Sequence, residues 1–209
     1  MIKSSTKSAI YLVDLLKSEV KPALGCTEPV AVALACSKAR ELLKEEIIDC
    51  NILVSPNVYK NGMCVGIPGT DKLGLKIAAS MGLIGGDSEY GLRVLECLDE
   101  EQIKIAEEYI NKNIIKISPA DVKEKVYIEV ELKGNDNTVK TIIRTKHDNF
   151  VYISKNDEIS LNKDVVIQEV RLTNEEENLL EKMSIRELIQ EIENMELEDI
   201  EFLIDGIEM

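Results

Sequence analysis

The chain has 209 residues, of which 44% are hydrophobic, and carries a formal net charge of −14. Its length suits one domain or a domain with an appended segment, and its apolar content is ample for a core. The acidic balance argues against nucleic acid and anionic membrane surfaces as partners, because both carry negative charge themselves. No stretch of about 18 apolar residues occurs, so the sequence predicts no membrane-spanning helix.

The first half of the chain is predicted to be rich in helix, because its apolar residues recur at helical spacing. We expect helices over residues 7–20, 29–46, 72–83, 88–98 and 100–111. Short strands are expected over 47–54 and 63–67, with a loop rich in Pro, Asn and Gly over 55–62 between them. Thr70 or Asp71 can cap the third helix, and Asp99 can cap the fifth.

The chain then becomes rich in strands, because apolar and polar residues alternate. We expect strands over 114–117, 126–132, 139–145, 150–154 and 165–170. Gly134-Asn135-Asp136-Asn137 is a strong signal for the turn of a hairpin. The whole pattern predicts an α+β fold, a mixed and largely antiparallel sheet with helices packed on one face, followed by the start of a helical domain.

The C-terminal segment is acidic and predicted to be helical. Residues 175–208 hold 13 Asp and Glu against two Lys and Arg, a net charge of −11. Asn174 and Ser184 are N-caps, each with a glutamate three residues later, which is the spacing of a capping box. We therefore divide the chain into an α+β domain over 1–172 and an acidic helical segment over 173–209. The apolar stripes of this segment predict either dimerisation or poor behaviour of the 209-residue chain in isolation. The alternative is a solvated C-terminal helical hairpin of a complete protein.

The five cysteines are odd in number, and no two form a C-x-x-C pair. Because the N-terminus leads into an amphipathic helix without an export signal, we expect reduced thiols in the cytoplasm. Their spacing alone defines neither a zinc site nor an iron–sulfur site. Core positions are expected for four of them, namely Cys36, Cys50, Cys64 and Cys97.

The fifth cysteine lies in the stretch Leu24-Gly25-Cys26-Thr27-Glu28-Pro29, which reads as a sharp turn and a helix start. Thr27 is a good N-cap, and Pro29 fits the first helical turn. Cys26 would then lie at the positive end of a helix dipole, where a reactive thiolate is favoured. The alternative is a capped helix start with a buried, inert cysteine.

A second stretch, Asn57 with Lys60-Asn61 and then Val65-Gly66-Ile67-Pro68-Gly69-Thr70, completes a family resemblance. Together with Gly25-Cys26-Thr27-Glu28-Pro29, it resembles the L-cysteine desulfidase family, which is similar to the iron–sulfur L-serine dehydratases. The resemblance implies a carbon–sulfur or carbon–oxygen lyase of amino-acid catabolism, which converts L-cysteine to pyruvate, ammonia and sulfide. It also implies a [4Fe-4S] cluster and no pyridoxal phosphate. Members are longer, so the chain is interpreted as an N-terminal fragment that is inactive alone.

The resemblance assigns residues to roles. Cys26 is the catalytic candidate, either as a thiolate acting in the reaction or as a metal ligand to the cluster, whose other ligands are expected outside this chain. Thr27 either caps the helix or contacts the substrate, and Glu28 either complements the helix dipole or belongs to the substrate site. Asparagine amides can hydrogen-bond both the carboxylate and the ammonium of an amino acid, and a lysine ammonium can pair with the carboxylate. The substrate-binding candidates are Thr27, Glu28, Asn57, Lys60, Asn61, Gly69 and Thr70.

Gly69 and Thr70 are candidates because backbone N–H groups at the start of the third predicted helix can hold an anion. Gly69-Thr70-Asp71-Lys72 is also similar to the β portion of the serine dehydratases and to an allosteric substrate-binding domain of some phosphoglycerate dehydrogenases. That similarity supports a different alternative, a non-catalytic module that senses a small molecule.

The substrate and the oligomeric state stay open on the sequence alone. Nothing in the sequence separates L-cysteine from L-serine or another β-substituted amino acid as substrate. The expected partner is a small amino acid, with a homodimer as an open possibility. His147, the single histidine, is predicted to be an exposed turn residue, and without a Ser-His-Asp arrangement a hydrolase is disfavoured.

Overall fold

The computed structural model describes residues 7–163 and 177–204, which divide into two compact units. Residues 23–163 form one unit, and residues 7–22 with 177–204 form the other. The predicted boundary between residues 172 and 173 lies outside the described residues. No helix among the described residues is long and apolar enough to cross a membrane.

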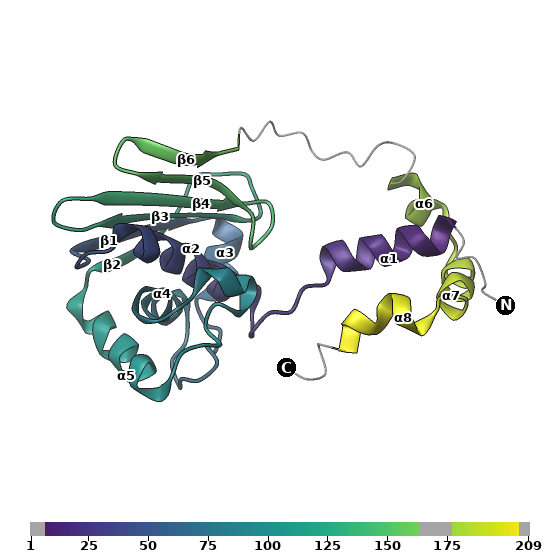
Figure 1. The fold of residues 1–209 in the computed structure, drawn as a ribbon, viewed down its shortest axis with the longest axis horizontal. Helices are drawn as coiled ribbons and strands as arrows, with labels where there is room; N and C mark the ends of the chain where they lie inside the picture. Colours follow the sequence, from purple (N-terminus) through teal and green to yellow (C-terminus); the bar gives the residue numbers. More distant parts are fainter. Residues whose placement is uncertain (1–6, 164–176, 205–209) are drawn as a thin grey trace. The chain divides into compact units, whose positions relative to one another are not determined.

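The larger unit is built on a six-stranded sheet. The strands are β1 (Asp49–Val54), β2 (Ile115–Pro119), β3 (Tyr127–Lys133), β4 (Thr138–Arg144), β5 (Phe150–Lys155) and β6 (Glu158–Asn162). Their order is β2-β1-β3-β4-β5-β6, in which β1 and β2 pair in parallel and the other neighbours pair antiparallel. The predicted α+β fold with a mixed, largely antiparallel sheet is confirmed (Figure 1).

Helices cover one face of this sheet, as the alternation of buried and exposed residues along the strands requires. The helices of this unit are α2 (Thr27–Leu43), α3 (Pro56–Gly62), α4 (Leu75–Ile84), η1 (Ser88–Arg93), α5 (Glu100–Tyr109) and η2 (Ile110–Lys112), of which α2, α3 and α4 contact strands. The central helix α2 contacts β3 and β4 and packs along α4, which in turn contacts α5 (Figure 1). Side chains of Ile52, Val130 and Leu132 point into this core, and each is at most 1% exposed.

Small residues set the close approach of α2 and α4. A Cβ added at Gly82 of α4 would meet the carbonyl oxygen of Ala33 on α2, and the Cα of Ala33 would lie only 2.9 Å away. The α2 sequence around this contact is almost entirely buried alanine and valine. The site-bearing N-terminus of α2 is therefore fixed by a backbone-to-backbone packing contact.

Local predictions failed where turn-forming residues dominate. Residues 55–62 are helical rather than a loop, since Ser55 caps α3 by accepting a 3.4 Å hydrogen bond from the backbone N–H of Val58. The strand predicted over 63–67 is reduced to an isolated bridge between Gly66 and Leu73. Helix α4 begins at Leu75, because Gly74 with φ 93° is its N-cap.

The remaining differences are local. Of the helix predicted over 88–98, only Ser88–Arg93 is helical, as a 3₁₀ segment interrupted at Gly91 with φ 55°. Strand β6 was missed, and the strand predicted over 165–170 lies outside the described residues. The Asp99 capping box at α5 is present as predicted. Cys64 and Cys97, which the sequence placed in the core, are exposed, whereas Cys36 and Cys50 are buried.

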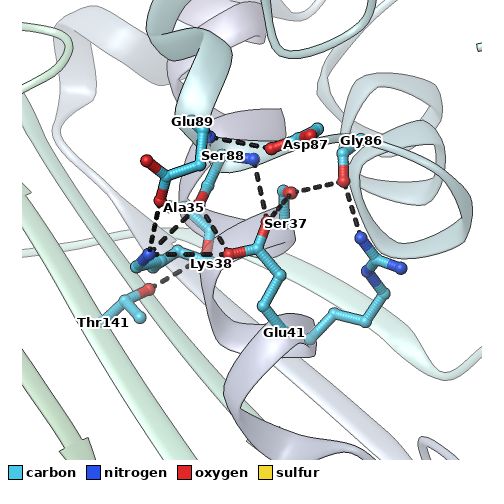
Figure 2. A network of polar contacts seen from close by, with 10 residues as sticks. Ala35, Ser37, Lys38, Glu41, Gly86, Asp87, Ser88, Glu89 and Thr141 are labelled. Carbon is cyan, nitrogen blue, oxygen red and sulfur yellow. Dashed lines mark hydrogen bonds and ion pairs between the residues drawn. The ribbon is translucent and has the colours of Figure 1, made fainter. Parts of the chain in front are cut away.

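A polar network joins α2 to the turn before η1 (Figure 2). Glu41 accepts hydrogen bonds from the Ser88 N–H at 2.8 Å, the Ser88 hydroxyl at 2.6 Å and the Ser37 hydroxyl at 3.1 Å. The single proton of the Ser37 hydroxyl is shared between Glu41 and the carbonyl oxygen of Gly86, which lies 2.7 Å from the hydroxyl. Burial acts to raise the pKa of Glu41, but these donors and the Lys38 ammonium at 3.6 Å together lower it.

We expect Glu41→Gln to reduce the free energy of unfolding at pH 7 by about 1–2 kcal/mol, because it weakens charge-assisted hydrogen bonds. A folded-state pKa below the unfolded value means that the carboxylate stabilises the fold above the unfolded pKa. That contribution is lost as the pH falls through the folded pKa. The free energies of unfolding of the unmodified protein and of Glu41→Gln, measured with urea, should therefore differ at neutral pH and become equal in acid. Glu96→Gln, which breaks an exposed pair with Arg93, is the control and should have little effect at either pH.

The second unit consists of α1 (Lys7–Glu19), α6 (Glu177–Lys182), α7 (Ile185–Glu193), α8 (Leu197–Ile200) and η3 (Glu201–Ile204). Ser184 caps α7, and its side chain and that of Glu187 form the predicted capping box. The other predicted cap, Asn174, lies outside the described residues. The described part of the acidic segment, residues 177–204, is helical, as the sequence predicted.

Candidate functional site

Cys26 is the N-cap residue of α2, where it lies exposed at the end of a sharp turn. The turn depends on Gly25, whose φ of 84° favours glycine. A Cβ at Gly25 would come within 3.0 Å of the Pro68 ring, so the Gly25 turn and the Pro68 loop lie against each other. The backbone N–H of Leu24 donates to the carbonyl of Leu92 at 3.1 Å and anchors the turn. The two stretches singled out in the sequence are thus neighbours in the fold.

Glu28, in the first turn of α2, collects donors from three side chains. Its Oε2 accepts from the Cys26 thiol at 3.4 Å and from the Thr27 hydroxyl at 3.5 Å. Its Oε1 accepts from the Asn61 amide of α3 at 2.9 Å. The N-cap of α2 is Cys26 and not Thr27, and Glu28 binds side chains in addition to complementing the helix dipole. The carboxylate links the cysteine to the second stretch.

The pKa of the Cys26 thiol is raised, in contrast to the lowered value that a helix start alone predicts. Partial burial is the largest cause, followed by the hydrogen bond to Glu28 and its negative charge. Backbone N–H groups of Glu28 and Thr27 oppose this shift without overcoming it. The Cys26–Glu28 pair is therefore a protonated thiol held by a carboxylate.

The pKa of Glu28, in contrast, is lowered. Burial would raise its pKa most, but the Asn61 hydrogen bond, its own backbone N–H, the Cys26 thiol and the charge of His147 lower it. His147 lies in the turn between β4 and β5, as predicted, yet it is only half-exposed and close enough to Glu28 to act electrostatically. Sequence reasoning missed this neighbour, because no spacing pattern connects a lone histidine to a glutamate so far away in the chain.

Replacing Glu28 with Gln should make Cys26 more reactive. The substitution removes the negative charge beside the thiol, so the pKa of Cys26 should fall, and its alkylation at pH 7.5 should become about threefold faster. Iodoacetamide labelling, quantified peptide by peptide, measures this rate with Cys64 as the internal reference. Glu45→Gln is the matched control, since that carboxylate binds the 135–137 turn instead. A slower or unchanged rate in Glu28→Gln would contradict the coupling.

Helix α3 carries the other polar candidates. Asn57, Lys60 and Asn61 are exposed and spaced three or four residues apart, which places them on one side of α3. Asn61 points its amide at Glu28, so that side adjoins the Cys26 turn. These three residues could bind the carboxylate of a small substrate next to the thiol.

Gly69 and Thr70 lie apart from a helix N-terminus, contrary to the prediction. Thr70 instead closes a turn in which its hydroxyl accepts from the Lys72 N–H at 2.8 Å. Both residues line an open groove of about 520 Å³ against α5, together with Asp71, Glu100, Ile103, Lys104 and Glu107. The helix start on which their anion-binding role was predicted lies further along the chain, at Leu75, and their substrate-binding role stays a prediction.

The described residues offer Cys26 as one thiol that could bind a metal cluster. Among them no group of three His, Cys, Asp or Glu side chains is placed to hold a metal ion. A [4Fe-4S] cluster is held by several thiolates. The donors that this part of the chain provides therefore do not fit a complete cluster site.

Comparison with known proteins places the chain among relatives of unassigned activity. It is 54% identical over 198 residues to a UPF0597 protein of Clostridioides difficile (strain 630), which covers 94% of this chain and 46% of the relative. UPF0597 proteins of Alkaliphilus oremlandii and Actinobacillus pleuropneumoniae are 43% and 39% identical, over 95% and 96% of this chain and 46% and 45% of their own lengths. The chain thus spans less than half the length of these relatives.

These relatives correct the family resemblance. The recognition of the chain as the N-terminal portion of an L-cysteine desulfidase is wrong, because the relatives carry the UPF0597 name, and that name states no activity. No protein-family model matches the chain, and no solved structure matches it. The chain is similar to UPF0597 proteins over nearly all of its own length.

Proposed function

We propose that the chain contributes the thiol-bearing part of a lyase site that acts on a small α-amino acid with a leaving group on Cβ, such as L-cysteine or L-serine. The reaction is an α,β-elimination followed by hydrolysis, which turns L-cysteine and water into pyruvate, ammonia and hydrogen sulfide. L-serine gives pyruvate and ammonia. The observation that carries the proposal is the hydrogen-bonded row Cys26–Glu28–Asn61 beside the exposed polar side of α3.

The row supplies the proton transfer that elimination needs. Glu28 accepts the Cys26 thiol hydrogen bond at 3.4 Å and holds the sulfur in place. Because the pKa of Glu28 is lowered and that of Cys26 is raised, the thiol loses its proton to solvent rather than to Glu28. The resulting thiolate is then a base for the Cα proton of the amino acid. Asn61 fixes the rotamer of Glu28 through its 2.9 Å hydrogen bond. Cys26 is thus the catalytic candidate, and Glu28 and Asn61 position it.

Lys60 and Asn57 can hold the substrate. An ammonium and an amide on the exposed side of α3 suit the carboxylate of an amino acid, which would direct Cα toward the Gly25–Cys26 turn. Thr27, whose hydroxyl donates to Glu28 at 3.5 Å, contributes to the row rather than to substrate contact. The five free thiols suit a reducing compartment, and the cytoplasm is proposed accordingly.

A [4Fe-4S] cluster stays a proposal for the complete protein. Cys26 can donate one thiolate to it, and the described residues do not donate the others. When bound, such a cluster would act as a Lewis acid toward the leaving group. Binding of the substrate and transfer of its Cα proton are assigned to this chain's own side chains.

The test is an anaerobic assay of pyruvate and ammonia release by the protein expressed from its complete reading frame, with L-cysteine, L-serine and D-cysteine in parallel. The proposal expects turnover of an L-amino acid, little turnover of the D-amino acid, and no turnover by the isolated 209 residues. Absence of pyruvate from every amino acid with a β-leaving group, in protein that is folded and reduced, would refute it.

A second candidate is a non-catalytic module that senses a small molecule, and the groove beside Thr70 favours it. This groove has the volume for an amino acid and lacks Cys26 among its lining residues. Calorimetric titration of amino acids into the chain separates the two candidates. Binding that Thr70→Val or Lys104→Met weakens and Cys26→Ser leaves intact would favour the sensor.

A further inference from the structure

The helices α7, α8 and η3 present apolar side chains to solvent. Ile185 and Leu197 are each 78% exposed, and Ile189, Ile192 and Ile204 are each about half exposed. Ile185, Ile189 and Ile192 recur at the spacing of a single helix face. We call these five residues the C-terminal apolar face. Exposed isoleucine and leucine on this scale indicate a surface that another surface covers.

The surface is also hollowed. A cavity of about 400 Å³ opens between α8 and η3, and its lining is mostly aliphatic. The lining residues are Leu197, Glu198, Ile200, Glu201, Leu203 and Ile204. A concave apolar surface with acidic residues around it accepts a protruding apolar side chain, as the centre of a protein interface does.

Charge argues against a second copy of this chain as the occupant. Residues 177–204 carry nine Asp and Glu against two Lys and Arg, a net charge of −7. A two-fold dimer through this face would set the same acidic rim against itself. A complementary occupant has an apolar centre and a rim of Lys or Arg.

The relatives indicate where such an occupant is found. The C. difficile protein matches 94% of this chain with only 46% of its own length, and more than half of it lies outside the match. The relatives of Alkaliphilus oremlandii and Actinobacillus pleuropneumoniae show the same proportion. In those relatives a region of that size is tethered to the matched segment, so it meets the corresponding face at a high effective concentration.

We propose that the C-terminal apolar face is the docking surface for the region that the longer relatives carry beyond the matched segment. The contact is made by an apolar patch of that region with a basic rim. It is an interaction between parts of one protein, and it is independent of the lyase activity proposed above.

Hydrogen exchange tests the docking on proteins as they exist. The amides of α7 in the 209-residue chain should exchange about tenfold faster, or more, than the amides of the matched segment in the full-length C. difficile relative. Equal exchange in the two proteins would overturn the proposal. So would protection of α7 that rises with the concentration of the 209-residue chain, because that result identifies a second copy as the occupant.

A variant pair supplies the independent check. In the 209-residue chain, the double variant Ile189→Ser/Ile192→Ser should lower the fluorescence of a bound hydrophobic dye about twofold and leave the melting temperature nearly unchanged. Ile48→Ser, at a residue that is 49% exposed in the other unit, is the control and should leave the dye signal as it is. A clear fall in melting temperature in the double variant would show that the face is packed within this chain, and would overturn the proposal.

Discussion

Replacing Cys26 with Ser in the protein expressed from its complete reading frame is expected to lower amino-acid turnover by about a thousandfold, the scale of a lost general base. Serine preserves the shape of the N-cap, but its hydroxyl ionises far less readily than a thiol and supplies no base at neutral pH. The measurement is the rate of pyruvate release under anaerobic conditions. Cys97→Ser, at another exposed cysteine, is the control and should retain full turnover.

The iron content of the two variants distinguishes the roles of Cys26. Lost turnover with unchanged iron would make Cys26 a participant in proton transfer, and joint loss of turnover and iron would make it a ligand. Turnover that survives in Cys26→Ser would contradict both proposed roles of Cys26, the proton-transfer role and the ligand role.

Gly82→Ala is expected to destabilise the larger unit strongly. In most helices this change stabilises by up to about 1 kcal/mol. Here the new Cβ meets the backbone of Ala33, where no side chain can move aside, so we expect a net loss of about 3 kcal/mol in the free energy of unfolding. Urea unfolding followed by circular dichroism measures the change.

The matched control is Gly66→Ala. A Cβ at Gly66 finds its nearest neighbour, a Leu73 methyl group, at 3.9 Å, which is an ordinary contact. We expect a change of at most about 0.5 kcal/mol there. Similar losses in both variants would show that α2 and α4 are not held as closely as the Gly82 contact requires.

The sequence predicted the strands because their alternation is local and strong. The meander from β3 to β5 was recognised from alternating residues such as Ile128 and Val130 and from the turn at 134–137. Helix α3 was missed because Pro56 and Gly62 read as loop residues, although Pro56 occupies the first helical turn behind the Ser55 cap. Strand β6 was missed because its residues are mostly exposed and it forms an edge of the sheet.

The candidate site was predicted in its parts but not in its connections. Both stretches were singled out, and the fold brings Asn61 to Glu28 and Pro68 to Gly25. The direction of the Cys26 pKa was wrong because partial burial of the thiol, followed by the carboxylate beside it, outweighs the effect of the helix start. That carboxylate, Glu28, is two residues away in sequence, and its orientation toward Cys26 depends on α3. The substrate roles of Asn57 and Lys60 stay predictions.

The parallel pairing of β1 with β2 sets an order of events in folding. The antiparallel strands β3 to β6 are joined by short turns and can pair early, whereas β1 and β2 meet only after the whole segment from Ser55 to Ile114 has been closed into a loop. That segment contains α3 and the Pro68 loop, which lie beside Cys26 and Glu28. The thiol–carboxylate row lies outside the meander, so a chain halted at the meander stage would have a sheet without a site.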